Sequence, residues 1–102
     1  MKAKPANILL EKHLKELGLS WVPEFVFSDR KWRFDYYCGN HLAIEIEGGV
    51  YSRGRHTRGS GYEKDLEKYN WATLLGYRVL RFSTGQVLRG EAKEFLAKWL
   101  EK

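Results

Sequence analysis

The stretch KWRFDYYCGNHLAIEIE, residues 31–47, decides the fold because it has the pattern of two strands joined by a tight turn. Its two halves are rich in aromatic and aliphatic residues, and the Gly39-Asn40 pair between them is typical of a turn. Along the second half, aliphatic side chains alternate with Glu45 and Glu47, so one face is apolar and the other carries two carboxylates. The stretch therefore predicts an antiparallel hairpin.

Elements on either side of this hairpin complete the expected fold. Leucine spacing predicts a helix over residues 5–17, and a short apolar run predicts a strand over 21–27. After the hairpin we expect a helix over 62–75, a strand over 77–82 and a helix over 91–102. Because strand–helix–strand segments form right-handed crossovers, the third and fourth strands should be parallel neighbours. The prediction is an α/β fold with a mixed four-stranded sheet flanked by helices, in the order α-β-β-β-α-β-α.

The composition is that of a small basic protein, with 102 residues, 43% of them hydrophobic, and a formal net charge of +5. It favours a single folded domain over residues 1–102. The single Cys38 cannot form an internal disulfide and no apolar run could span a bilayer, so we expect a cytoplasmic protein with no membrane partner. The charge favours a nucleic acid as partner, although it also fits a basic protein without an anionic ligand.

Three carboxylates are candidates to meet on one face of the hairpin. Glu45 and Glu47 lie two apart in a strand, about 7 Å from each other. Asp35 lies on the preceding strand, on the face expected to be opposite Phe34 and Tyr36. Carboxylates this close destabilise one another unless a cation neutralises them, and oxygen ligands at a strand end suit Mg²⁺. The alternative is the ordinary solvated face of a half-exposed sheet.

Residues 48–61 form a glycine-rich loop with the chemistry of a phosphate-binding segment. Arginine forks match phosphate oxygens, and small neighbours let the backbone approach closely. A histidine among them could donate a proton to the leaving oxygen, contact a phosphate or hold a metal-bound water. The residues concerned are Arg53, Arg55, His56 and Arg58. A second basic run, either on the same nucleic-acid path or merely solvated, consists of Arg30, Lys31 and Arg33.

Five motifs occur in order between residues 7 and 90: FD, AIEIEGG, GRHTRG, DLEKYN and GYRVLRF. Together they resemble the PD-(D/E)XK nuclease superfamily, and in particular its small stand-alone branch related to the very-short-patch mismatch-repair endonucleases of bacteria and phages. The resemblance implies a restriction-endonuclease-like core. It also implies that Asp35 is the signature aspartate and that Glu45 is the second acidic metal ligand.

The sequence departs from the family pattern at Glu47, which stands where the signature lysine is expected. The resemblance implies that Glu47 binds metal or acts as a base, and that a lysine could have moved to the second helix. Lys68 is the candidate there, the alternative being a solvated lysine paired with Asp65. The family also carries a glutamate on its first helix, for which Glu11 fits best, and Glu24 is a further possibility.

The resulting prediction is a DNA endonuclease that depends on Mg²⁺ or Mn²⁺, with nicking or structure-selective cleavage. Its expected setting is the cytoplasm of a bacterium or of a phage-infected cell. Cutting both strands, as a Holliday-junction resolvase does, would require a homodimer. Two other classes of protein are alternatives. One is a nucleic-acid-binding module that has lost catalysis, which the missing lysine favours, and the other is a scaffold subunit of a larger complex. The expected catalytic residues are Asp35, Glu45, Glu47, His56, Lys68 and Glu11, of which Asp35, Glu45 and Glu47 would hold the metal.

Overall fold

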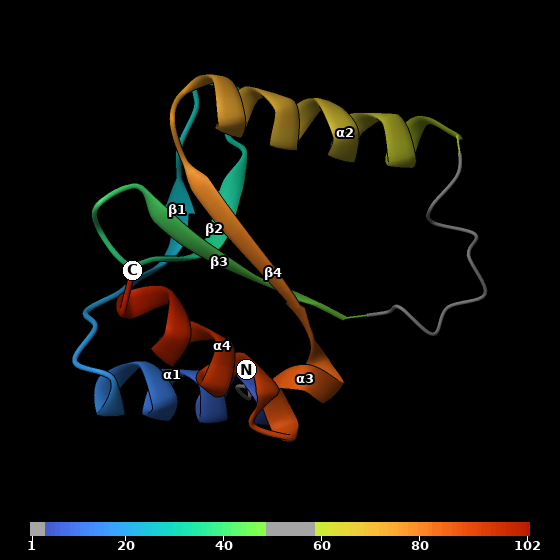
Figure 1. Cartoon of the computed structure of the whole chain (residues 1–102). Helices are drawn as coiled ribbons and strands as arrows, with labels where there is room; N and C mark the ends of the chain where they lie inside the picture. The colour runs from blue at the N-terminus through green and yellow to red at the C-terminus, as the bar shows by residue number, and fades with distance from the viewer. Residues whose placement is uncertain (1–3, 49–58) are drawn as a thin grey trace.

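The computed structural model of the chain describes residues 4–48 and 59–102. Figure 1 shows its helices and strands, which alternate as a helix, a three-stranded meander, a helix, a strand and two further helices. Their bounds are α1 (Pro5–Glu16), β1 (Val22–Val26), β2 (Arg33–Tyr37), β3 (Leu42–Glu47), α2 (Gly59–Leu74), β4 (Arg78–Ser83), α3 (Thr84–Leu88) and α4 (Glu91–Leu100).

The strands form one mixed sheet in the order β1-β2-β3-β4. β1 pairs antiparallel with β2, and β2 pairs antiparallel with β3. β4 returns through α2 and pairs parallel with β3, with Glu45 beside Arg81 in the register. The predicted fold class is confirmed: the protein is α/β, with a mixed four-stranded sheet flanked by helices.

The predicted hairpin between β2 and β3 is also confirmed. Three successive residues of the turn have a left-handed backbone conformation, with φ of 85° at Gly39, 51° at Asn40 and 65° at His41. The Cys38 N–H donates to the Leu42 carbonyl at 2.8 Å and closes the turn. Glycine and asparagine tolerate this conformation, which explains why the Gly-Asn pair marks the hairpin in the sequence.

Each face of the sheet is covered by its own helices, as Figure 1 shows. On one face, α1, α3 and α4 cover Tyr36, Ile44 and Phe82, and the buried core there includes Leu10, Leu14 and Leu96. On the other face, the smaller cluster brings Ala72 of α2 onto Phe27, Phe34 and Ala43. The central strand β3 is consequently covered on both sides, and the face that carries Glu45 is not open to solvent as a half-exposed sheet would be.

The short helix α3, which follows β4, was not predicted from the sequence. Ser83 caps it: its hydroxyl accepts the Gln86 N–H at 3.0 Å, and the Gln86 side chain accepts the Ser83 N–H at 2.9 Å. This capping box is readable in the sequence as Ser-x-x-Gln directly after the strand. The helix contributes Val87 to the core and brings Thr84 and Leu88 to the edge of a pocket described below.

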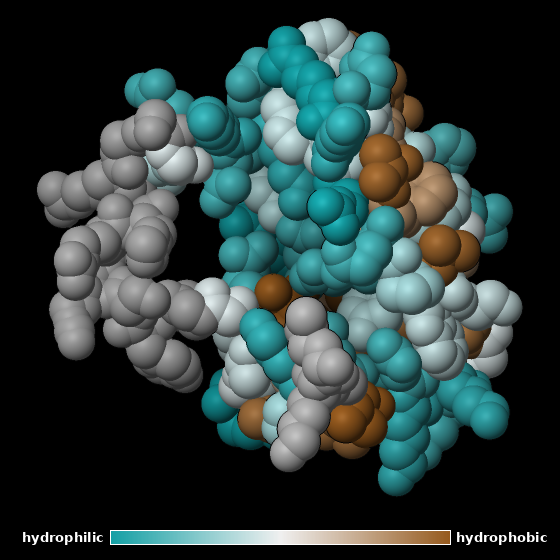
Figure 2. Space-filling view, turned by 180° about the vertical axis from the view of Figure 1, so that it is seen from behind, coloured by the Kyte–Doolittle hydropathy of each residue, from teal (hydrophilic) through white to brown (hydrophobic). Residues whose placement is uncertain are grey.

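The side of the molecule seen in Figure 2 is mainly hydrophilic, with small apolar patches between charged and polar residues. None of the helices in the two described ranges is long and apolar enough to cross a membrane.

Candidate active site

Asp35 lies where the antiparallel ladder between β1 and β2 is interrupted. The ladder skips one residue on each strand, Glu24 and Asp35, and Glu24 takes a left-handed φ of 52°. The side chains of β2 change face at this interruption. Phe34 packs under α2, whereas Tyr36 packs on the opposite face of the sheet, beside α1. The expectation that Phe34 and Tyr36 share a face is therefore wrong, because the alternation of side chains breaks at Asp35, although the register with β1 is the same before and after it.

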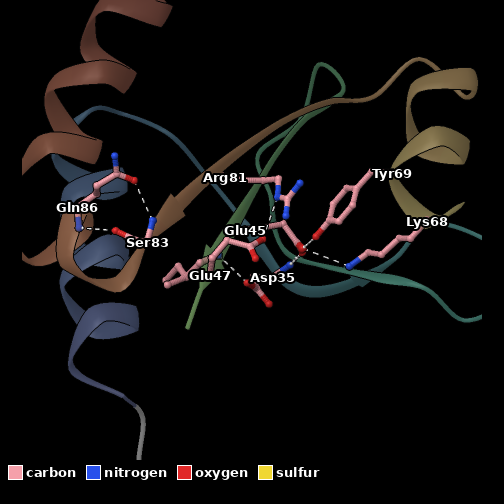
Figure 3. A network of polar contacts seen from close by, with 9 residues as sticks. Asp35, Glu45, Glu47, Lys68, Tyr69, Arg81, Ser83 and Gln86 are labelled. Carbon is pink, nitrogen blue, oxygen red and sulfur yellow. Dashed lines mark hydrogen bonds and ion pairs between the residues drawn. The ribbon is translucent and has the colours of Figure 1, made fainter. Parts of the chain in front are cut away.

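Two crossed hydrogen bonds between β2 and β3 hold Asp35 beside Glu45: one joins Asp35 to Glu45, and the other joins Asp35 to Ile46 (Figure 3). The Asp35 backbone N–H donates to Glu45 Oε2 at 2.9 Å, and the Ile46 N–H donates to Asp35 Oδ2 at 2.8 Å. Each carboxylate therefore takes the place that a backbone carbonyl has in a regular ladder. This arrangement fixes the two side chains next to each other on the central pair of strands.

Glu45 is the one buried charged residue among those described, with 6% of its surface exposed. Two residues of α2 satisfy its second oxygen: Lys68 Nζ approaches Glu45 Oε1 to 3.2 Å, and the Tyr69 hydroxyl donates to the same atom. The alternative that Lys68 is a solvated lysine paired with Asp65 is wrong, because its side chain is only 17% exposed and pairs with Glu45. Burial, and then the bond to Glu45, raise the pKa of Tyr69, so its hydroxyl remains a donor.

Glu47 is bonded to a cation on the neighbouring strand. Arg81 Nε donates to Glu47 Oε2 at 2.9 Å, and this bond is the main cause of the raised pKa of Arg81. The Arg81 guanidinium also lies over the Tyr69 ring, 4.3 Å from its centroid, which joins the Glu45 and Glu47 groups into one network. Sequence reasoning missed Arg81 and Tyr69. The sequence shows an arginine in the fourth strand. Its position beside the acidic residues of β3 can be predicted only when the parallel register of the two strands is known.

A pocket of about 620 Å³ opens beside Asp35, on the side of α1. Glu11 and Glu24 line it together with Asp35, so the structure brings two of the further acidic candidates to the same place. Glu11 is held there by Tyr36, whose hydroxyl donates to Glu11 Oε2 at 2.7 Å. The Asn7 amide donates to the Tyr36 oxygen at 3.0 Å, which completes a short polar chain in the pocket wall.

The charge around Asp35 suits a hard cation. Burial is the main cause of a raised pKa of Asp35; the Ile46 N–H opposes it, and the nearby Glu45 and Glu24 carboxylates raise it further. A cation bound by Asp35 and Glu45 would relieve this repulsion, and carboxylate oxygens are the donors that Mg²⁺ prefers. The donor set of this pair therefore fits the predicted metal.

Glu47 does not complete a three-carboxylate cluster. Among residues 4–48 and 59–102, no group of three or more Asp, Glu, His or Cys side chains is arranged to hold a metal ion. The carboxylate of Glu47 is bonded to Arg81 instead. The expected convergence of three carboxylates is thus not found in the described part of the chain, and the metal-binding roles of Asp35, Glu45 and Glu47 stay predictions.

The basic residues expected to contact nucleic acid fall into two sets. Arg30 is ion-paired with Glu67, Arg33 is paired with Glu24 at 3.1 Å, and Lys31 sits in the β1–β2 turn with a φ of 67°. These three basic residues thus lie at one end of the hairpin, and two of them, Arg30 and Arg33, form exposed ion pairs. The other set lies outside the described residues and consists of Arg53, Arg55, His56 and Arg58.

Comparison with solved structures finds a protein of the same fold. The chain is similar to the catalytic domain of the homing endonuclease I-Bth0305I, with a TM-score of 0.75 and 24% sequence identity, over 97% of each chain. At this identity the likeness establishes the fold. No protein-family profile matches the chain, and no curated protein sequence is significantly similar to it.

Proposed function

We propose that this protein is a divalent-metal-dependent DNA endonuclease that hydrolyses phosphodiester bonds, by nicking or by selecting particular DNA structures. The observation that carries the proposal is the Asp35–Glu45 pair, which hydrogen bonds between β2 and β3 hold in place, with Asp35 in the wall of a pocket. It is supported by the fold that the chain shares with the catalytic domain of a homing endonuclease. The motifs from FD to GYRVLRF support membership of the PD-(D/E)XK superfamily, in the branch related to very-short-patch endonucleases.

In this proposal Asp35 and Glu45, with Glu47 as the third candidate, hold Mg²⁺ or Mn²⁺. The bound ion would supply an activated water and offset the charge that develops on the leaving oxygen. Burial of Glu45 and its hydrogen bonds keep the pair in place before the ion binds. Positioning by rigid strands is what such a site requires, because small displacements of the ligands cost large factors in rate.

Lys68 takes over part of the role of the missing signature lysine. Its ammonium lies 3.2 Å from Glu45 Oε1, so it holds that carboxylate and places a positive charge beside the reacting phosphate. Glu11, held by Tyr36 in the wall of the same pocket, is placed to accept a proton from a water or to orient it. The pocket beside Asp35 is the space in which that water and the phosphate would lie.

The basic residues hold the DNA strand. In the segment outside the described residues, Arg53, Arg55 and Arg58 would bind phosphates, and His56 would protonate the leaving oxygen or hold a metal-bound water. Arg30, Lys31 and Arg33 would extend the contact along the hairpin end. One copy of the chain offers one such site, so cleavage of both strands, including resolution of a four-way junction, would take a homodimer.

The experiment that tests the proposal is a cleavage assay on supercoiled plasmid and on duplex, mismatched, single-stranded and four-way-junction oligonucleotides. We expect nicking or cutting with Mg²⁺ or Mn²⁺ and none with EDTA. Loss of a group that merely supports a metal ligand costs about 10- to 100-fold, so Asp35→Ala and Glu45→Ala should each lower the rate by more than about 100-fold. Glu91→Ala is the matched control, because Glu91 is an exposed glutamate on α4 paired with Arg89.

Three results would count against this proposal, each in a different way. No metal-dependent cleavage of any of these DNAs would leave the catalytically inactive binding module, for which Glu47 in place of the lysine speaks. Cleavage by Asp35→Ala and Glu45→Ala at the rate of the unchanged protein would show that the active site lies elsewhere. Absence of DNA binding at low salt would favour the scaffold subunit.

A further inference from the structure

A second pocket, of about 460 Å³, lies between the β1–β2 turn and the C-terminal half of α2. It is separate from the pocket beside Asp35, and the two share no lining residue. Its walls combine two indole rings with a guanidinium and a few small polar groups. The residues that line it are Ser28, Asp29, Arg30, Trp32, Trp71 and Leu75.

The pocket already holds a flat, delocalised group. The Arg30 guanidinium lies 5.0 Å from the centroid of the Trp32 ring and 6.0 Å from that of Trp71. Glu67, one turn earlier on α2, forms the ion pair that keeps Arg30 in this position. The side chains of Arg30 and Glu67 are 51% and 46% exposed. Such an exposed ion pair contributes little free energy, so a ligand can compete with Glu67 for Arg30.

Core packing does not account for Trp71. Trp32 packs against the smaller core cluster and stacks near Phe27, at 6.2 Å between ring centroids. Trp71 belongs to neither core cluster and leaves 41% of its surface exposed, while the neighbouring Ala72 fills the core position of α2. A large aromatic ring held at the surface beside an arginine is the combination that stacks on nucleobases.

The pocket is lined by residues close in sequence to residues of the candidate active site. Trp32 precedes Asp35 by three residues along the chain into β2, or about 10 Å at the rise of a strand. Trp71 follows Lys68 by three residues on α2, or about 5 Å along the helix axis.

We propose that this pocket binds an unpaired nucleobase of the DNA strand held in the candidate active site, with the base stacked on Trp71 and Trp32. Arg30 then leaves Glu67 and contacts the strand's phosphate or the face of the base. The inference rests on the proposed nuclease function for the identity of the strand. It adds a preference for DNA with an unpaired base near the cut, such as a mismatch, a bulge or a branch point.

The test measures binding without cleavage, in EDTA, by fluorescence anisotropy of the full chain. The probes are a labelled single-stranded oligothymidine and an abasic oligonucleotide of the same length and charge. We expect the unchanged protein to bind the base-containing strand more tightly, and Trp71→Ala to weaken that binding about tenfold with little effect on the abasic strand. Leu74→Ala is the matched control, because Leu74 is an apolar residue of the same helix with 71% of its surface exposed.

A second variant separates stacking from apolar contact. Trp71→Leu keeps an apolar side chain without an aromatic face and should bind like Trp71→Ala, whereas Trp71→Phe should keep most of the preference. Equal affinity of the unchanged protein for the two strands would overturn the inference, as would normal binding of oligothymidine by Trp71→Leu. Circular dichroism checks that each variant is folded.

The cleavage assay distinguishes failure of this inference from failure of the proposed function. Metal-dependent plasmid cleavage without a base-dependent difference in binding would support the nuclease function and contradict the proposed base pocket. A Trp71-dependent preference for bases, without cleavage under any condition, would support the proposed base pocket and contradict the nuclease function. No binding to either strand would exclude the base pocket, and the cleavage assay would still decide the nuclease function.

Discussion

The backbone of Asp35 donates a hydrogen bond to the side chain of Glu45, and the Asp35 side chain accepts one from the backbone of Ile46. The two acidic residues thus replace regular strand pairing with contacts between side chains and backbone. A sheet gains little from placing a buried carboxylate beside a partly buried one, because each negative charge disfavours ionisation of the other. Such a local cost at the centre of a sheet is typical of a functional site.

The first prediction is that Asp35→Asn stabilises the protein in EDTA at neutral pH. Burial is the main cause of the raised pKa of Asp35, so its contribution to stability is full below the unfolded value of 3.8 and is lost as pH rises through the folded pKa. Asparagine carries no charge and can still accept the Ile46 N–H. In urea titrations its midpoint should exceed that of the unchanged protein at pH 7, and the difference should shrink towards pH 4.

Mg²⁺ should reverse this order. A cation bound by Asp35 and Glu45 stabilises the folded state according to its concentration relative to its dissociation constant, so the unchanged protein should gain stability as Mg²⁺ is added. Asp35→Asn should gain much less. An equal response of the two proteins to Mg²⁺ would contradict a metal site at Asp35, whatever the cleavage assay gives.

The second prediction concerns the ion pair between Lys68 and Glu45, whose side chains are 17% and 8% exposed. Lys68→Met should lower the free energy of unfolding by about 2 kcal/mol in EDTA, because it leaves a buried carboxylate without its cation. Full burial of both partners would cost about 3–5 kcal/mol, and Lys68 keeps some contact with solvent. Lys64→Met, at an exposed position of the same helix, is the control and should leave stability nearly unchanged.

Mg²⁺ again provides the sharper readout for Lys68. If the ion takes the place of the ammonium beside Glu45, it should restore part of the stability that Lys68→Met loses. Cleavage should still fall, since the proposed role of Lys68 includes a positive charge near the phosphate. A variant that is fully stable in EDTA would mean that the pair contributes nothing to holding Glu45.

The order and pairing of the strands could be predicted from local patterns. Gly39-Asn40 between two strand-like runs predicts the hairpin, and the strand–helix–strand segment fixes the parallel neighbour. The capping box at Ser83 was also present in the sequence, although the helix it begins is only five residues long. Such elements depend on a few hydrogen bonds and carry no clear hydrophobic period.

The contacts within the site could be predicted only in part. Asp35 and Glu45 were expected to meet, and they do, but alternation along a regular strand does not foresee the skipped pair at Glu24 and Asp35. Across this unpaired position, the side chains of Phe34 and Tyr36 pack on different faces of the sheet. Arg81 and Tyr69 come from elements distant in sequence, so their contacts with the glutamates depend on the register of β4 and the docking of α2.

The third prediction is a loss of stability on acidification that depends on His13. Burial, and then the charge of Lys93, lower the pKa of His13, and its Nδ1 is buried without a hydrogen-bond partner in the described residues. The stability linked to this group is full above the unfolded value of 6.5 and is lost as pH falls below it towards the folded pKa. His13→Leu should flatten the pH dependence of the urea midpoint between pH 7.5 and 5.5.

The matched control for this experiment is His41→Gln. His41 is an exposed histidine in the hairpin turn, near Tyr77. Its substitution should leave the pH dependence as it is in the unchanged protein. The same slope in His13→Leu and in the unchanged protein would assign the acid sensitivity to other groups.

The last prediction separates the structural role of Glu47 from its proposed catalytic one. Glu47 and Arg81 form a partly exposed ion pair at 2.9 Å, so Glu47→Lys should cost at most about 1 kcal/mol by placing two cations together. Combining it with Arg81→Glu reverses the pair and should recover most of that stability. Cleavage should not recover, because the double variant keeps Glu45 but lacks the carboxylate that the proposed metal site has at position 47. Cleavage by the double variant at the original rate would reduce Glu47 to a partner of Arg81 and leave Asp35 and Glu45 as the proposed metal-binding pair.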